Sequence, residues 1–95
     1  MRFLDLHLEC PVCRQPIIAN EPGKRNGSTN CTVRAVLARE VGPYDAYAYY
    51  KGALTCPGCT TRVAVYFRDA IRRYPPRTEV RRVRILDPDD GFIED

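Results

Sequence analysis

Residues 10–13 read Cys-Pro-Val-Cys, and residues 56–59 repeat the pattern as Cys-Pro-Gly-Cys. Two residues between the cysteines allow both sulfurs of a tight turn to point at one ion, and two such turns supply a tetrahedral shell of four thiolates. The proline after the first cysteine fixes the backbone φ angle and removes an amide donor, which favours a preformed turn, or knuckle, over a helix. The spacing therefore predicts one structural metal site with the ligands Cys10, Cys13, Cys56 and Cys59.

Zinc is the metal that four cysteines at this spacing predict. A secreted disulfide framework is disfavoured, because five cysteines are an odd number and acidic residues interrupt the stretch where a secretory signal would be apolar. A redox role for residues 56–59 in a thioredoxin-like fold would need more chain than follows Cys59. An iron centre like that of rubredoxin also uses paired knuckles, usually with glycine after the second cysteine, where this chain has Arg14 and Thr60. These alternatives stay open beside zinc.

The length of 95 residues predicts one domain with a modest core, which buries roughly 60–70% of the surface that the unfolded chain exposes. We expect a single zinc-binding domain over residues 1–86, with an exposed, flexible loop at residues 20–30 and an acidic tail at residues 87–95. A structural zinc contributes on the order of 10–16 kcal/mol in small finger peptides, which exceeds the usual net stability of a domain. The metal is therefore expected to be needed for folding.

Alternating apolar and polar residues predict several β-strands. The first is expected to lead into the first knuckle, and a short return strand would make that knuckle the tip of an antiparallel hairpin. Two further strands are expected before the second knuckle, and one more near the C-terminus. The expected strands cover residues 3–9, 17–19, 31–40, 44–51 and 78–86. Residues 31–40 would also suit a helix, but their β-branched start favours a strand.

Apolar residues also recur at helical spacing after the second knuckle, at positions 63, 66, 67, 70, 71 and 74. Thr60 or Thr61 could cap such a helix, and the two prolines at residues 75–76 would end it. A strand with alternate residues on one face accounts only for residues 63–67. We therefore predict a small α+β fold, in which zinc-stabilised β-hairpins are followed by one helix, at least over residues 66–74, and a final strand.

The paired knuckles at residues 10–13 and 56–59 resemble two broad classes of zinc protein, the zinc ribbons and the treble clefs. In zinc ribbons both knuckles lie at hairpin tips, whereas in treble clefs the second pair lies in the first turn of a helix, which matches the helix expected after Cys59 better. A short basic chain with a Cys-Pro-x-Cys start also resembles the small phage transcription activators of the Ogr/Delta type, whose second pair is usually closer. These resemblances imply nucleic-acid binding, a part in transcription or translation, or protein docking.

The net charge of +3 conceals an uneven distribution. Residues 87–95 carry five acidic residues and no base, so residues 1–86 carry fifteen bases against seven acids, and thirteen of the bases are arginine. Guanidinium groups pair with phosphate through two hydrogen bonds and stack on bases. The pattern predicts contacts to the phosphates of nucleic acid from seven of the eight arginines between residues 62 and 84, namely Arg62, Arg68, Arg72, Arg73, Arg81, Arg82 and Arg84.

Each of these features also has a plainer interpretation. An arginine-rich segment is commonly a solvated face. Tyr47 and Tyr49 could stack on single-stranded bases, but tyrosines on one face of a strand more often pack under a helix. His7 is expected to be exposed on the first strand, and Cys31 to be a small buried thiol. The tail at residues 87–95 is expected either to be solvated or to compete with nucleic acid for the arginines.

Catalysis finds little support in the sequence. No Ser/His/Asp set, glycine-rich phosphate loop or pair of carboxylates can be assembled, and a zinc ion held by four cysteines has no open position for a reacting water. We predict a cytoplasmic, non-catalytic zinc module without membrane segments or small-molecule substrate, which binds nucleic acid as a small regulator of transcription or translation. The alternatives are a phage-encoded docking adaptor or inhibitor of an enzyme such as RNA polymerase, and a redox switch that loses its zinc.

Overall fold

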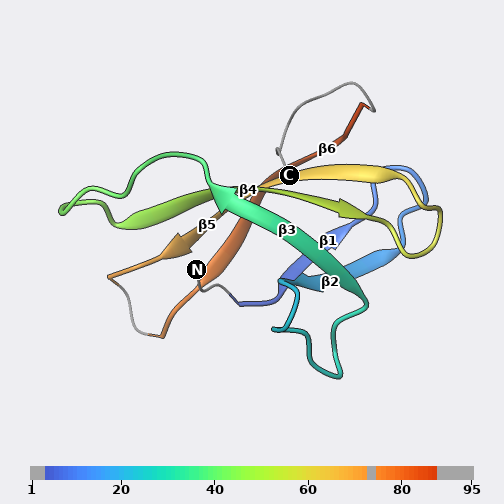
Figure 1. Cartoon of the computed structure of the whole chain (residues 1–95), viewed down its shortest axis with the longest axis horizontal. Coiled ribbons are helices and arrows are strands. Elements are labelled where there is room, and N and C mark those ends of the chain that lie inside the picture. Colours follow the sequence, from blue (N-terminus) through green and yellow to red (C-terminus); the bar gives the residue numbers. More distant parts are fainter. Residues whose placement is uncertain (1–3, 73–74, 88–95) are drawn as a thin grey trace.

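The computed structural model describes residues 4–72 and 75–87, and these residues form β-strands and no helix. The strands follow one another in the sheet in chain order, so that each lies beside its neighbour in sequence (Figure 1). All pairings are antiparallel except the short parallel one between β2 and β3. The six strands are β1 (Leu6–Glu9), β2 (Pro16–Asn20), β3 (Cys31–Leu37), β4 (Tyr47–Thr55), β5 (Arg62–Ala70) and β6 (Thr78–Ile85).

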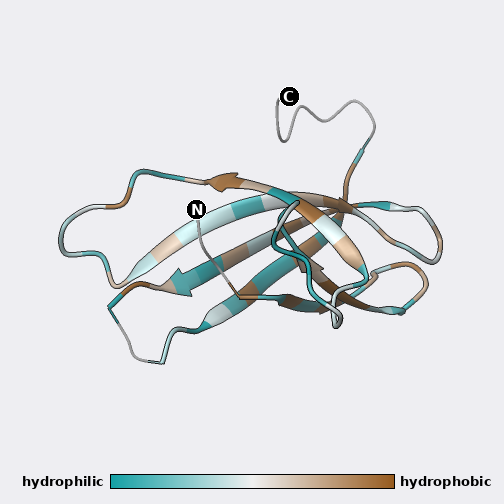
Figure 2. Ribbon diagram, turned by 60° about the horizontal axis from the view of Figure 1, so that its bottom comes forward, coloured by the Kyte–Doolittle hydropathy of each residue, from teal (hydrophilic) through white to brown (hydrophobic). Residues whose placement is uncertain are grey.

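The sheet curls, so that its first and last strands approach each other. β1 and β6 lie in contact, and the backbone amide of Leu4, just before β1, donates a hydrogen bond of 2.9 Å to Oγ1 of Thr78 at the start of β6. One face of the curled sheet therefore surrounds the core, while the opposite face points outward. Figure 2 shows hydrophobic and hydrophilic residues following one another along the strands, as this arrangement requires.

The core is made by alternate residues of all six strands. Tyr50 of β4 stacks on Phe67 of β5, with ring centroids 5.1 Å apart and an angle of 13° between the planes. Complete burial of a large aliphatic or aromatic side chain stabilises a fold by roughly 1.5–3 kcal/mol. The largest fully buried side chains are Phe67, Leu6, Ile17, Leu54, Val33, Val63 and Val65, together with the cysteines Cys10 and Cys56.

The predicted helix after the second knuckle is wrong, and so is the α+β fold class. β5 pairs with β4 at all nine of its positions, from Thr55–Arg62 to Tyr47–Ala70, and with β6 on its other side. Residues 63, 65 and 67 point into the core, whereas Tyr66, which a helix would place beside them, belongs to the opposite face. Strands on both sides satisfy the backbone hydrogen bonds of β5, and its β-branched and aromatic residues fit a pleated surface. The expected helix also included residues 73–74, which lie outside the described ranges.

The other expected elements are strands, with shifted ends. The strand expected at residues 44–51 begins at Tyr47 and continues to Thr55, because β4 stays paired with β5 up to the second knuckle. The segment expected to be a loop, residues 20–30, leads from β2 to β3 and is mostly exposed. Local bonds shape it, among them one of 3.1 Å from the amide of Asn26 to Thr29 Oγ1. Of the expected acidic tail, only Asp87 is among the described residues.

Candidate metal centre

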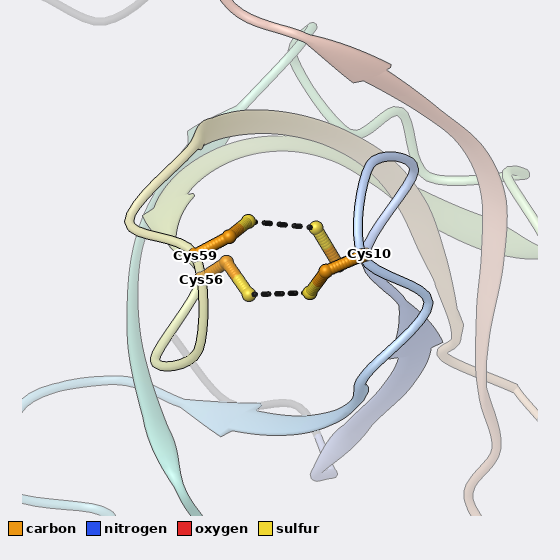
Figure 3. Close-up of side chains that lie close together, drawn as sticks. Cys10, Cys56 and Cys59 are labelled. Atoms are coloured by element: carbon orange, nitrogen blue, oxygen red, sulfur yellow. Dashed lines mark hydrogen bonds between the residues drawn. The ribbon is translucent and has the colours of Figure 1, made fainter.

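Both cysteine pairs lie in loops that join antiparallel strands, the first between β1 and β2 and the second between β4 and β5. The curl of the sheet brings the two loops face to face, with their sulfurs pointing toward each other (Figure 3). The Sγ atoms of Cys10 and Cys59 are 3.6 Å apart, and so are those of Cys13 and Cys56. All four sulfurs lie within 4.8 Å of one another, so the predicted ligands form one cluster that could hold a metal ion.

The distances in the cluster fit metal coordination better than disulfide bonding. A Zn–S bond of about 2.3 Å in a tetrahedral shell places neighbouring sulfurs about 3.8 Å apart. The two separations of 3.6 Å are close to this value, whereas a disulfide requires about 2.05 Å. All five cysteines are free thiols, and Cys31 lies outside the cluster. Two of the sulfur–sulfur separations therefore match a tetrathiolate site, and all four sulfurs lie close enough together to share one ion.

The two knuckles have the same backbone hydrogen bonds. In each knuckle, the carbonyl of the first cysteine accepts a hydrogen bond from the amide of the residue that follows the second cysteine. The amide of the first cysteine donates to the carbonyl of the residue two positions after the second cysteine. This repeat gives both loops the same tight shape, which directs two sulfurs to one side. The four bonds are Arg14 N to Cys10 O at 3.0 Å, Cys10 N to Gln15 O at 3.0 Å, Thr60 N to Cys56 O at 3.0 Å and Cys56 N to Thr61 O at 2.9 Å.

Backbone amides also point at the sulfur of the first cysteine in each knuckle. The amide of Val12 donates to Cys10 Sγ and that of Gly58 to Cys56 Sγ, both at 3.4 Å. Such bonds favour the thiolate over the thiol. Accordingly, the amides of Cys59 and Gly58 lower the pKa of Cys56. The residue types at these positions matter little, because every residue other than proline provides this donor.

The four sulfurs do not all ionise readily without a cation. The hydroxyl of Thr61, 3.1 Å from Cys59 Sγ, and the Thr61 amide lower the pKa of Cys59 to about 6. The Gln15 amide lowers the pKa of Cys13, but loss of water and the neighbouring sulfurs outweigh it and raise this pKa to about 11. A metal ion needs all of its cysteine ligands as thiolates, so its binding must release protons. The cluster is thus a site whose metal affinity depends on pH.

The residue after the second cysteine of each knuckle has a left-handed backbone conformation. The φ angle is 65° at Arg14 and 63° at Thr60. Glycine adopts this region freely, whereas residues with a Cβ are less stable there by roughly 1–2 kcal/mol, and β-branched residues are rare. The absence of glycine at these positions was the one departure from iron-type knuckles visible in the sequence. Both knuckles therefore keep a strained residue that the surrounding structure holds in place.

The face of β3–β6 that points away from the core, called the outer face below, carries several of the predicted arginines. Paired residues of neighbouring antiparallel strands share a face. One row across the four strands consists of Arg34, Ala53, Ala64 and Arg84. The next row consists of Val36, Lys51, Tyr66 and Arg82. Arg62, which pairs with Thr55, lies at the knuckle end of the same face.

Two predicted arginines are engaged with other groups. Arg68 forms an ion pair of 2.8 Å with Glu79, and its guanidinium lies 4.0 Å from the centroid of the Tyr47 ring. This ion pair lowers the pKa of Glu79. Arg72 donates a hydrogen bond of 2.9 Å from Nε to the carbonyl of Asp45, away from the rows of the outer face. Arg68 and Arg72 are therefore weaker candidates for phosphate contacts than their place in the sequence indicated.

The positions of the other basic residues could not be predicted from the sequence. Arg81 is exposed at the irregularity of β6, where it has no partner in the β5 register, and Arg73 lies outside the described residues. Arg34 and Lys51 reach the outer face although they lie outside the arginine-rich segment at residues 62–84. Only the register of β3 with β4 brings them there, and register depends on contacts between distant parts of the chain.

The other singled-out side chains have structural surroundings. His7 is exposed on β1 and is not one of the clustered ligands. Cys31 is buried, and its Sγ lies 3.2 Å from the carbonyl of Thr55. Tyr47 and Tyr49 do not pack under a helix as expected, since residues 4–72 and 75–87 form none; their rings lie 6.2 Å apart, and Tyr50 occupies the core instead.

Comparison of the chain with protein families, with curated proteins and with solved structures gives no match. In the part of the chain that the structure describes, no helix is long and apolar enough to cross a membrane. Two features of this molecule bear on its function, the four-cysteine cluster and the composition of the outer face.

Replacement of Thr60 by glycine is expected to stabilise the metal-loaded protein. Glycine removes roughly 1–2 kcal/mol of left-handed strain, and the greater freedom of the unfolded chain offsets about 0.5–1 kcal/mol of this gain. Thr60→Ala is the control, because it keeps the strain and loses the same hydroxyl bond to the Cys59 carbonyl. Urea unfolding should therefore rank Thr60→Gly above Thr60→Ala by about 1 kcal/mol. The opposite order would show that the knuckle is not strained at this residue.

Thr61→Val should change the number of protons that metal binding releases. At pH 7, Cys59 with a pKa of about 6 is mostly ionised before the metal arrives, whereas Cys13 with a pKa of about 11 must lose a proton. Without the Thr61 hydroxyl, the pKa of Cys59 rises and this thiol also has to be deprotonated. Calorimetric zinc titrations in two buffers should show up to one additional proton released and an affinity reduced roughly tenfold for each unit by which the pKa of Cys59 exceeds the pH of the titration. Equal proton release by both proteins would contradict the assigned role of Thr61.

Proposed function

We propose that this protein is a non-catalytic module, stabilised by one structural zinc ion, that binds nucleic acid through the outer face and acts as a small regulator in transcription or translation. The observation that carries the proposal is the outer face itself, where four neighbouring strands contribute basic side chains. These side chains are Arg34, Lys51, Arg62, Arg82 and Arg84. A cytoplasmic location belongs to the proposal, because a reducing compartment keeps the four cysteines available as ligands.

The proposal assigns zinc to the cluster because four thiolates in a closed shell are a common structural site for this ion. Cys10, Cys13, Cys56 and Cys59 would hold the ion, and the amides of residues 12 and 58 would support the charge on two of the sulfurs. With all four positions taken by protein ligands, the ion supplies stability and no reacting water. This coordination, rather than any missing side chain, is the reason for proposing a non-catalytic role.

The shape of the outer face suits an extended strand of nucleic acid. Ala53 and Ala64 lie in the middle of one row and, with Leu86 and Tyr66, form a small apolar cluster between the basic side chains. Because Ala53 and Ala64 are themselves buried, a strand would contact Tyr66 and the surrounding basic side chains, whose guanidinium and ammonium groups can reach phosphates. The guanidinium of Arg82 lies 5.8 Å from the centroid of the Tyr66 ring, which places a cation beside an aromatic surface.

A second candidate function rests on exposed apolar residues at the end of the sheet opposite the knuckles. Leu37 and Val41 are exposed there, and Tyr44 in the β3–β4 loop is 95% exposed. Ile71, also exposed, follows β5 and bonds through its amide to the carbonyl of Ala46 beside the same loop. Such a surface would suit a docking adaptor or inhibitor, in particular a phage-encoded one that acts on a larger enzyme such as RNA polymerase. Weak salt dependence of binding would mark this alternative.

The zinc proposal predicts different outcomes for two buried cysteines. Cys10→Ser removes a ligand and should abolish the folded state at ambient temperature, because the metal contributes more free energy than the net stability. Cys31→Ser is the control, since this cysteine is also buried but lies outside the cluster; it should fold and retain one equivalent of zinc. Circular dichroism and metal analysis of both variants provide the test. A folded, metal-free Cys10→Ser protein would refute the structural role of the metal.

The nucleic-acid proposal predicts binding that weakens steeply with salt. Fluorescence anisotropy of the zinc-loaded protein with labelled single-stranded RNA, single-stranded DNA and duplex DNA measures this at two salt concentrations. Arg82→Ala should weaken binding roughly 3–10-fold and reduce the log–log salt slope by about one, as expected for the loss of one phosphate contact. Lys24→Ala removes one positive charge from the exposed loop before β3 and should have little effect. No binding at low salt, or equal effects of both substitutions, would refute the outer face as the binding surface.

A further inference from the structure

A cleft of about 380 Å³ opens at the knuckle end of the outer face, between the start of β3, the end of β4 and the start of β5. Its lining includes three arginines from three separate segments of the chain, and none of the described residues that line it is acidic. Hydroxyl and amide groups complete the polar part of the wall. The polar lining residues are Arg25, Arg34, Arg62, Asn30, Thr32 and Thr55.

Threonine hydroxyls orient two of the three guanidinium groups. Nη1 of Arg62 donates to Thr55 Oγ1 at 2.9 Å, and Nη1 of Arg25 donates to Thr32 Oγ1 at 3.4 Å. Each hydroxyl takes one of the five N–H donors that a guanidinium carries. Arg34 follows Thr32 by two residues in β3 and therefore shares its face. The side chains that face the cleft thus provide positive charge and hydrogen-bond donors in a confined volume.

The charge of the cleft indicates the kind of anion that fits it. Three positively charged side chains that line one cleft repel one another, and none of the described residues that line it is acidic. An internal phosphodiester carries one negative charge, whereas a phosphate monoester carries about 1.5–2 negative charges at pH 7 and has three acceptor oxygens. A monoester therefore complements three arginines better than an internal backbone phosphate does.

We infer that this cleft is a binding site for a phosphate monoester, as found at the end of a nucleic-acid strand or in a free nucleotide. The inference deepens the proposed function where the ligand is a strand, because the cleft continues into the outer face through Arg34 and Ala53. If the ligand is a free nucleotide, the inference does not require that the protein binds nucleic acid. The inference also assigns phosphate binding to Arg25 and Arg34, which lie outside the arginine-rich segment.

The cleft also depends on the metal centre for its shape. Thr55 directly precedes Cys56, and Arg62 directly follows Thr61, so both ends of the second knuckle form part of the wall. Cys31 lies at the cleft with its Sγ 3.2 Å from the Thr55 carbonyl. Loss of the metal would therefore displace the donors, and phosphate binding must be measured on the zinc-loaded protein.

The test compares oligonucleotides that differ only in a terminal phosphate. Internally labelled single strands with a 5′-phosphate, a 3′-phosphate or neither are titrated with the zinc-loaded full chain by anisotropy. In parallel, adenosine monophosphate, inorganic phosphate and adenosine are titrated in an NMR experiment that follows the amides of Thr32 and Thr55. We expect about tenfold tighter binding of one phosphorylated strand, and shifts with adenosine monophosphate that adenosine does not produce.

Two variants separate the cleft from the rest of the outer face. Arg34→Gln should abolish the preference for a terminal phosphate and the NMR shifts, while Arg82→Gln, outside the cleft, should weaken all strands alike and keep the preference. Circular dichroism and zinc content verify that both variants are folded.

The possible outcomes distinguish the inference from the proposed function. Shifts with adenosine monophosphate but no binding of any strand would support the cleft as a nucleotide site and refute the nucleic-acid proposal. Binding of all strands with equal affinity, and no shift with either phosphate compound, would overturn the inference and leave the nucleic-acid proposal standing. Shifts that persist in Arg34→Gln would also overturn it.

Discussion

The contact between the two knuckles is the interaction on which the rest of this structure depends. It joins the β1–β2 hairpin to the β4–β5 hairpin through four sulfurs within 4.8 Å of one another. Backbone pairing between the two halves of the sheet is short on this side, since β2 and β3 share only two paired positions, Ala19–Cys31 and Asn20–Thr32. Because a core of this size provides limited stability, a cation that holds four thiolates together is well placed to keep the sheet curled.

The cluster also explains features that would otherwise be unfavourable. Loss of water and the neighbouring sulfurs oppose ionisation, which is why the pKa of Cys13 is raised although the Gln15 amide lowers it. Left-handed conformations at Arg14 and Thr60 each store roughly 1–2 kcal/mol of strain. Metal binding, on the order of 10–16 kcal/mol in small zinc peptides, far exceeds these unfavourable contributions. The same constraint fixes Thr55 and Arg62 at the ends of the second knuckle, so the metal centre and the basic cleft form one continuous structure.

The sequence was sufficient to predict the four-cysteine cluster, because two residues between cysteines determine the local geometry wherever the knuckle lies. It was insufficient for β5, where Val63 and Phe67 fit both a helical and a strand periodicity. Pairing with β4, a contact between separate segments, decides between them. The composition of the outer face could be predicted only in part, because it also depends on contacts between separate segments. Arg62, Arg82 and Arg84 follow from the arginine-rich segment, but Arg34 and Lys51 join them only through strand register, which no local pattern reveals.

The most direct test of this account is X-ray absorption spectroscopy of the purified protein. The absorption edge identifies the metal, and the fine structure gives the type and distance of its ligands. The account predicts zinc with four sulfur ligands at about 2.3 Å. An iron edge would contradict the assigned metal, while nitrogen or oxygen ligands, or sulfur–sulfur scattering at about 2.05 Å from disulfides, would contradict the four-cysteine centre itself.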